Sequence, residues 1–328
     1  MAIPKGATAY LPSLLFMAAL LAAPSFAPAQ QYPVKPIRII VATAAGGGTD
    51  FVARLMGQKI TDALGQQVVV ENRPGAGSTV GIEAGLRAAP DGYTFNMITP
   101  SYAINPSLYP VKFDPLTDFT PVIQIARGPL IVLVHPSLPV RNARQLIALA
   151  KAHPGQLTSG TSGTGTIVHL AAEHFFDMAG IKLTHVPYKG GAPALIDLVA
   201  GQISLVFTPP QTALPQVKSG RLRAIAVTTA ERIAAEPAIP TIAESGVPGY
   251  EVTNWHGLIG PKGVPRAIVE RINGEVARSL SLKDMQERLQ ADGMTPTGGT
   301  PEQFHAQIRK EIEMWRGVVA HAGIKATD

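Results

Sequence analysis

The sequence contains no cysteine among its 328 residues. Disulfide bonds, cysteine-liganded zinc, iron–sulfur clusters and thiolate catalysis are therefore excluded for this chain. Charged residues are scarce, at 16%, and aromatic residues make up 6%. Nucleic-acid binding needs a clustered basic stripe with interleaved aromatic side chains, and the sequence has neither. We therefore expect no nucleic-acid partner.

Long apolar runs are also missing after residue 30, so the sequence predicts no membrane-spanning helix there. The apolar run at residues 14–23 is too short to span a bilayer, and it lies between Lys5 and an Ala-Pro-Ala site at residues 27–29. A basic residue, an apolar core and a small-residue site in that order are typical of a secretory signal peptide. We predict that residues 1–29 are such a peptide, cleaved near Ala29, and that the mature chain is periplasmic.

The remaining chain is long enough for two domains, and hydrophobic residues make up 46% of the sequence. Its most informative stretch, residues 37–55, reads as a β-branched strand, a loop with Gly46, Gly47 and Gly48, and a helix that Thr49 or Asp50 could cap. Such a junction has backbone N–H groups without intrahelical partners and the positive end of the helix dipole, which suits an anion. We predict that this anion is a carboxylate.

The following residues repeat the strand–helix alternation. Strands are predicted at residues 66–71 and 93–98, with a helix at 80–88 between them and a loop at 99–102. This β-α-β-α-β order predicts a parallel sheet whose functional loops lie at the carboxyl ends of the strands. The apolar residues 122–135 are a candidate crossover to a second domain.

The middle of the chain uses the same design again. Predicted strands at residues 157–160, 183–186, 203–207 and 222–227 alternate with helices at 143–152, 167–178 and 194–200, and polar or glycine-rich loops occupy 161–166, 187–193 and 208–210. A return crossover at 253–259 leads to helices at 266–280, 283–291 and 301–322. With no strand expected between those helices, we assign them to the first domain. The predicted domains are 33–130 with 253–328, and 131–252.

Several long motifs resemble one known family. The segments AAGGGTD, ENRPGAGS, INPSLY, GTSGTGT, HVPYKGGAPAL and PTIAESGVPGYE occur in that order. The chain resembles the extracytoplasmic solute-binding receptors of tripartite tricarboxylate transporters, the Bug family. This resemblance implies an α/β, type II periplasmic-binding-protein fold: two domains joined by two crossovers, with a cleft that closes on a small organic carboxylate. It also implies delivery of the ligand to membrane permease subunits.

Three residues depart from the family pattern. Thr43 replaces a common aromatic residue, and His256 replaces a common apolar or aromatic one. Thr208 lies near the position where many amino-acid-binding members carry an acidic residue that can hold an ammonium group. This difference argues against an amino-acid ligand. Mono-, di- and tricarboxylates, aliphatic or aromatic, all stay open.

Other chemistries fit the motifs less well. Phe51 occupies the position where a Rossmann loop needs its third glycine, and Thr164 occupies the final glycine position of a nucleophile elbow around Ser162. His169, Glu173 and His174 lack metal-site spacing, so packing or capping is the better interpretation of these histidines. We expect no enzyme activity, cofactor or metal.

The expected ligand contacts come from loops of both domains: Thr43, Ala45, Gly46, Gly47, Thr49 and Ser101 in the first, and Ser162, Gly163, Thr164, Gly165, Thr166, Tyr188 and Thr208 in the second. Tyr188 could instead cover a strand end, and Asp50 is expected to cap a helix because its charge would repel an anion. The protein is expected to be a monomer. The alternative functions are a periplasmic sensor that presents the ligand to a membrane receptor, and an exported hydrolase.

Overall fold

The computed structural model describes residue 2, residues 32–234 and residues 236–325. Apart from residue 2, the predicted signal peptide lies outside the described residues. Contacts divide the chain into two units, Met1–Val34 and Lys35–Asp328, and the described helices and strands belong to the second. Among the described residues, no helix combines the length and the apolarity needed to cross a bilayer.

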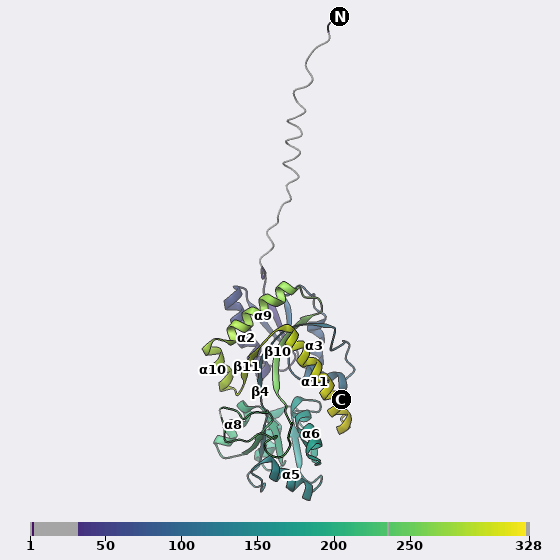
Figure 1. The fold of residues 1–328 in the computed structure, drawn as a ribbon, viewed down its shortest axis with the longest axis vertical. Coiled ribbons are helices and arrows are strands. Elements are labelled where there is room, and N and C mark those ends of the chain that lie inside the picture. Colours follow the sequence, from purple (N-terminus) through teal and green to yellow (C-terminus); the bar gives the residue numbers. More distant parts are fainter. Residues whose placement is uncertain (1, 3–31, 235, 326–328) are drawn as a thin grey trace. The chain divides into compact units, whose positions relative to one another are not determined.

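The first sheet has six strands in the order β11-β4-β10-β3-β1-β2 (Figure 1). The strands are β1 (Ile37–Val41), β2 (Val68–Asn72), β3 (Thr94–Ile98), β4 (Phe119–Gly128), β10 (Asn254–Pro261) and β11 (Thr295–Gly298). Strand β1 pairs parallel with β2 and β3, as the sequence pattern predicts, whereas β10 is antiparallel to β3 and β4. We call this sheet and its helices the first lobe.

Five of the six helices of the first lobe follow a glycine-rich or polar turn after a strand, and α10 follows α9. They are α2 (Gly48–Leu64), α3 (Thr79–Leu86), α4 (Ser101–Ile104), α9 (Arg266–Leu280), α10 (Lys283–Ala291) and α11 (Pro301–Ala322), with 3₁₀ turns η1 (Ala76–Ser78) and η2 (Asn105–Ser107). Helix α2 buries Val52, Met56 and Ile60 on one face, which is the helical spacing seen in the sequence.

The second sheet has five strands in the order β7-β6-β8-β5-β9. Its strands are β5 (Ile131–Val134), β6 (Thr158–Thr161), β7 (Thr184–Pro187), β8 (Leu205–Thr208) and β9 (Arg223–Val227), and its helices are α5 (Ala143–Ala152), α6 (Ile167–Ala179), α7 (Gly191–Val199) and α8 (Pro210–Lys218). Strand β6 is parallel to β7 and β8. This sheet and these helices are the second lobe.

Two connections join the lobes. Strand β4 in the first sheet ends at Gly128, and β5 begins at Ile131 in the second sheet. The return runs from β9 to β10. The first crossover lies within the predicted segment 122–135, whereas most of the predicted return segment 253–259 forms β10 of the first sheet. The mixed α/β fold with two sheets is confirmed. The domain boundaries at residues 130 and 253 stay a prediction.

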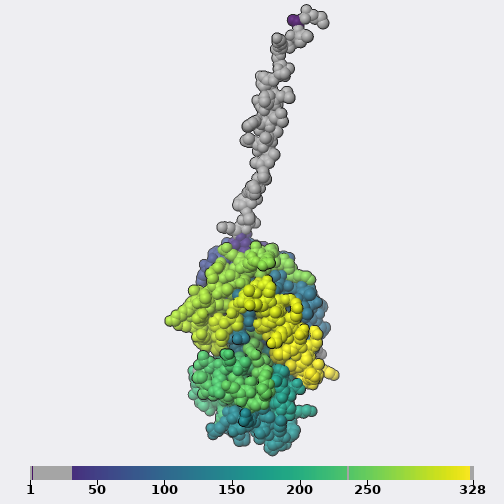
Figure 2. All heavy atoms as spheres, viewed as in Figure 1, coloured from purple at the N-terminus to yellow at the C-terminus, as the bar shows by residue number. Residues whose placement is uncertain are grey.

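One hydrophobic core extends through both lobes. Its buried residues include Tyr102 and Trp315 from the first lobe and Leu146 and Phe175 from the second. The long α11 contributes to this continuity because it packs on β4 in its own lobe and on α6 in the other (Figures 1 and 2). On its inner side, Glu311 accepts hydrogen bonds from the indoles of Trp255, at 2.6 Å, and Trp315, at 3.4 Å.

Four details differ from the sequence expectation. Strand β11 lies between α10 and α11, where no strand was expected, and it pairs with β4 at the sheet edge. The expected loop at residues 99–102 already begins the short α4. Helix α8, which contains Pro215, was not predicted. Helix α2 begins at Gly48 after Gly47 as the N-cap residue, so Thr49 and Asp50 lie within its first turn.

Candidate functional site

The loop after β1, residues 43–49, makes hydrogen bonds with the side chains of Asp50 and Asn72. The Gly46 amide donates to Asp50 Oδ2 at 2.9 Å, and Asn72 Nδ2 donates to the Thr43 carbonyl at 3.1 Å. Gly46 has a φ of 82°, a left-handed conformation that favours glycine. Residues 44–47 are exposed, and Thr49 is buried. The sequence thus places a glycine turn directly against the first turn of α2.

In this loop the first-turn amides of α2 favour a bound anion, whereas the carboxylate of Asp50 would repel one. Within the described chain, no side chain caps α2, so its first-turn amides and dipole face the loop. Asp50 lies underneath and pairs with Arg54, whose Nη2 is 3.0 Å from Asp50 Oδ1. Burial acts to raise the pKa of Asp50, but hydrogen bonds from Arg54 and Gly46 outweigh it, so the pKa lies below its usual value. Its charge is therefore already neutralised by Arg54.

An unsatisfied hydroxyl group lies in the same loop. Thr43 Oγ1 is buried and has no hydrogen-bond partner among the described residues. Buried hydroxyls are normally paired with protein or water, so an unpaired one at the carboxyl end of a strand is a notable donor. Thr43 is one of the positions that depart from the family pattern.

The loop after β6, residues 161–166, is the second predicted site loop and is folded by its own hydroxyls. Ser162 Oγ donates to Thr166 Oγ1 at 3.2 Å, and Thr166 Oγ1 donates to the Gly163 carbonyl at 2.8 Å. Gly163 and Gly165 have φ angles of 130° and 77°. Helix α6 follows from Thr166, and within the described chain no side chain caps its first turn.

Two stacked histidines lie beneath this second loop. The rings of His169 and His185 are 3.8 Å apart between centroids and 12° from parallel. His169 Nδ1 accepts from the Gly165 amide at 3.2 Å, and His185 Nε2 is 2.7 Å from Thr161 Oγ1. Burial and the neighbouring His169 lower the pKa of His185 to about 4. The sequence pattern indicates packing for His169 but does not predict this pair, because its members are on different elements.

Each site loop meets a residue of the opposite lobe that the sequence pattern did not indicate. A Cβ added at Gly48 would lie 3.0 Å from Gln211 Nε2 on α8. A Cβ added at Gly165 would lie 2.5 Å from Leu108 Cδ1 and 3.7 Å from the Tyr109 hydroxyl. Glycine therefore permits close approach of the lobes at both loops.

Three other predicted site residues lie near strand ends, but they differ in burial and in whether their hydroxyl groups already have a described partner. Thr208 is the last residue of β8 and is buried, and Ser101 is the first residue of α4. The Tyr188 ring lies against Gly160 of β6, and its hydroxyl donates to Asp197 Oδ2 at 2.6 Å. Burial, with the Asp197 carboxylate, raises the pKa of Tyr188 to about 12. Tyr188 therefore covers the end of a strand, and its hydroxyl already has an acceptor.

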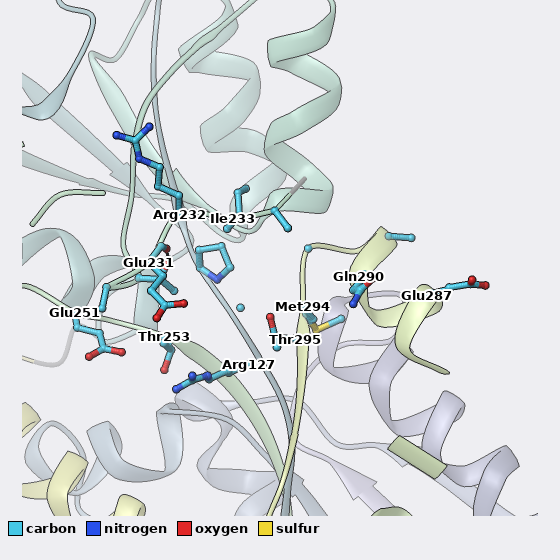
Figure 3. Close-up of a pocket in the computed structure, with 17 residues that line it drawn as sticks. Arg127, Glu231, Arg232, Ile233, Glu251, Thr253, Glu287, Gln290, Met294 and Thr295 are labelled. Carbon is cyan, nitrogen blue, oxygen red and sulfur yellow. Dashed lines mark hydrogen bonds between the residues drawn. The ribbon is translucent and has the colours of Figure 1, made fainter. Parts of the chain in front are cut away.

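A cavity of about 760 Å³ lies elsewhere, beside the two crossovers (Figure 3). Arg127 and Thr253 line it from the crossover strands, and Gln290 lines it from α10. Its size suits a small molecule, but three lining glutamates, Glu231, Glu251 and Glu287, outnumber two lining arginines. One of those, Arg232, is already paired with Glu244 at 2.9 Å. An anion therefore fits the loops better than this cavity.

The residues around the loops do not form an evident catalytic or metal centre. The Ser162 hydroxyl donates to Thr166, and the nearby His169 and His185 contact Gly165 and Thr161 instead. A serine nucleophile needs a base within hydrogen-bond reach. Within the described residues, no group of histidines and carboxylates is arranged to hold a metal ion.

An α/β fold with two sheets whose lobes are joined by two connections is typical of solute-binding proteins. The model of the tripartite tricarboxylate transporter family receptor matches residues 52–324, so the chain belongs to this family, which includes the Bug proteins. Protein BugT of Bordetella pertussis is 36% identical over 300 residues, covering 90% of this chain and 92% of BugT.

Solved structures give the same result. The structure of Rpa4515 from R. palustris with adipate is 37% identical with a TM-score of 0.82, and the match covers 90% of this chain and all of that one. MatC from Rhodopseudomonas palustris with bound malate is 30% identical with a TM-score of 0.78, and the match covers 88% and 100% of the two chains. The periplasmic binding protein BugD is 33% identical with a TM-score of 0.78, with 90% and 100% covered.

Proposed function

We propose that this protein is a periplasmic receptor that binds a small organic carboxylate between its lobes and delivers it to the membrane subunits of a tripartite tricarboxylate transporter. Residues 1–29 would direct export and be removed, and the mature receptor would act as a monomer without metal or cofactor. The lobes would correspond to domains at residues 33–130 with 253–328, and 131–252.

The observation that carries this proposal is the pair of glycine loops at the carboxyl ends of β1 and β6. Each continues into a helix whose first turn has no side-chain cap within the described residues. Both loops also approach the opposite lobe, at Gln211 and at Leu108. Neutral amides and hydroxyls from two lobes are a suitable environment for a carboxylate that must later be released.

The internal hydrogen bonds narrow the set of groups available to the ligand. The Gly46 and Gly165 amides already donate to Asp50 and His169. The best remaining donors are the first-turn amides of α2 and α6 and the Thr43 hydroxyl. We therefore keep the loop residues of both lobes in the proposed site and assign Gly46 and Gly165 a shaping role.

The expected affinity follows from the number of donors. A hydrogen bond to a charged group contributes about 1.5–3 kcal/mol, so four would contribute roughly 6–12 kcal/mol before association costs of at least about 4. Micromolar binding needs about 8 kcal/mol. Contacts to the remainder of the ligand, near Ser101 and Thr208, are therefore required. Relatives solved with adipate and with malate support a dicarboxylate as the first ligand to try.

The proposal is tested by thermal unfolding of the mature protein with a panel that includes adipate, malate, citrate and benzoate. A ligand at 100 times its dissociation constant should stabilise the protein by about 2.7 kcal/mol. Hexanamide and other neutral analogues serve as controls for the carboxylate. If no acid raises the melting temperature, the carboxylate proposal is wrong.

The Thr43→Val variant tests the placement of the site. It keeps the shape of the side chain and removes a buried hydroxyl without a described partner, so the fold should tolerate it. We expect the affinity for the stabilising acid to fall roughly tenfold, equivalent to about 1.4 kcal/mol. Calorimetric titration measures this. Thr295→Val, at an exposed position on β11, is the matched control and should bind as the unmodified protein does.

Uptake of the labelled acid by cells tests delivery. Cells that carry the membrane subunits should accumulate it only when the receptor is present. A receptor that binds the acid without supporting uptake would favour the sensor function instead.

A further inference from the structure

The stacked histidines beneath the 161–166 loop have a function that binding alone does not explain. His169 is buried on α6, with 3% of its surface exposed, and His185 lies on the neighbouring edge strand β7. Between them they hold two points of the loop, the Gly165 amide and the Thr161 hydroxyl. These two contacts add to the hydrogen bonds that the loop makes within itself.

The hydrogen bond at Gly165 determines the protonation state of His169. A backbone amide can only donate, so His169 Nδ1 must be the acceptor and must lack a proton. The proton of the neutral ring is then on Nε2, which faces Glu173 Oε1 at 3.6 Å. Protonation of Nδ1 would turn two N–H groups toward each other and break the Gly165 contact.

The stacking geometry adds a second constraint. Two imidazolium rings at 3.8 Å would repel each other strongly, so the stack is compatible with at most one positive charge. The charged group that acts on both rings is Glu173, one turn along α6 from His169. The negative charge of Glu173 acts to raise the pKa of His185, but burial and the neighbouring His169 outweigh it. Thr161 and Gly165 present only neutral groups to the rings.

We infer that His169 and His185 form a positioning pair that holds the 161–166 loop in its ligand-binding shape only while His169 Nδ1 carries no proton. A proton on His169 Nδ1 breaks the Gly165 contact, whereas the Thr161 hydroxyl can stay bonded to His185 in either protonation state. Loss of the Gly165 contact loosens the loop and lowers the affinity for the carboxylate. The pair therefore makes ligand release sensitive to acid. This inference rests on the proposed function for its effect on binding, but the state of the loop can be measured without any ligand.

The ligand-free test uses NMR of protein labelled with ¹⁵N-glycine. Between pH 8 and pH 5, the Gly165 amide resonance should move as the amide loses its acceptor. In His169→Gln, whose side-chain oxygen can accept from Gly165 but does not titrate, that movement should disappear. His153→Gln, which changes an exposed histidine at the end of α5, is the matched control and should titrate as the unmodified protein does.

The ligand test measures adipate affinity by calorimetry across the same pH range. The acid's own carboxyls titrate equally in every sample, so the ratio of variant to unmodified affinity reports on the protein alone. We expect affinity to fall at least tenfold from pH 8 to pH 5 in the unmodified protein, and at least threefold less in His169→Gln. His185→Phe, which keeps an aromatic ring in the stack and leaves His169 on Gly165, should retain the fall in affinity.

Each result is decisive. A Gly165 resonance that does not respond to pH, or one that titrates equally in His169→Gln, would overturn the inference even if adipate binds. Equal pH profiles in His169→Gln and the unmodified protein would overturn the link to binding. If no acid of the panel binds at pH 8, the proposed function fails, whereas the NMR titration still decides whether the histidines hold the loop.

Discussion

Gly165 combines a left-handed backbone, with φ of 77°, and a close approach to the opposite lobe. The backbone conformation costs an L-residue about 1–2 kcal/mol, whatever surrounds it. The approach of Leu108 adds a second penalty, because its side chain would have to move for a Cβ to fit. Comparing a substitution here with one at a glycine that has only the left-handed backbone therefore separates the cost of backbone strain from the cost of the contact with Leu108.

We predict that Gly165→Ala destabilises the protein by about 2–5 kcal/mol, the sum of the backbone and packing costs, and lowers carboxylate affinity about tenfold. Gly155→Ala is the matched control, because Gly155 has a φ of 74° and a Cβ added there would meet no atom of the described residues within 4 Å. It should cost about 1–2 kcal/mol and leave affinity unchanged. Urea unfolding and calorimetric titration measure both quantities. Equal affinities for the two variants would show that the Leu108 contact has no role in binding.

The loop residues illustrate what a sequence can specify about a site. Glycine and threonine between a β-branched run and an amphipathic segment indicate a strand–loop–helix junction, because local sterics and capping are encoded nearby in the chain. The internal partners of those loops are encoded elsewhere. Asp50 takes the Gly46 amide and His169 takes the Gly165 amide, so two predicted donors are already used. Gln211 and the His185 stack depend on tertiary packing and carry no local pattern.

At the scale of elements, β10 is a central strand of the first sheet and carries a buried histidine. His256 is 3% exposed, and its Nδ1 has no hydrogen-bond partner among the described residues. Burial lowers its pKa to about 4, from the usual 6.5. Between those values the unfolded chain binds a proton that the folded chain does not, so stability decreases as pH falls from about 6.5 to about 4.

We predict that His256 contributes up to about 3 kcal/mol to this loss, since each pKa unit corresponds to about 1.4 kcal/mol. Replacing it in His256→Leu should reduce the difference in unfolding free energy between pH 7 and pH 4.5. His153→Gln, at an exposed site, should leave that difference as it is. His185 acts in the same direction, so some pH dependence will persist. An unchanged difference in His256→Leu would contradict the prediction.

Long periodic elements were predictable, and short ones were not. The final three helices begin and end where the sequence pattern predicts, because their apolar faces repeat over many residues. Strand β11 has four residues that include Pro296 and Gly298, both poor strand formers, and only its pairing with β4 makes it a strand. Helix α8 contains two prolines, Pro210 and Pro215, and is supported by its contacts with β5 and β9. Tertiary contacts overrode local preference in both cases.

At the scale of the molecule, the shared core determines how the protein unfolds. Residues of both sheets belong to one buried cluster, and Lys35–Asp328 form one compact unit. We predict a single calorimetric transition for the ligand-free mature protein, with the van't Hoff enthalpy equal to the calorimetric enthalpy. Two resolved transitions, one per lobe, would show that the lobes fold independently.

Helix α11 has a further consequence because it packs on β4 in one lobe and on α6 in the other. Pulling the lobes straight apart would expose Trp315, which is 1% accessible, so a rotation about the α11 side is the less costly movement. Fluorophores placed far from α11 should then report the greatest change in separation. The chain has no native thiol, so two introduced cysteines would carry those dyes without any competing attachment site.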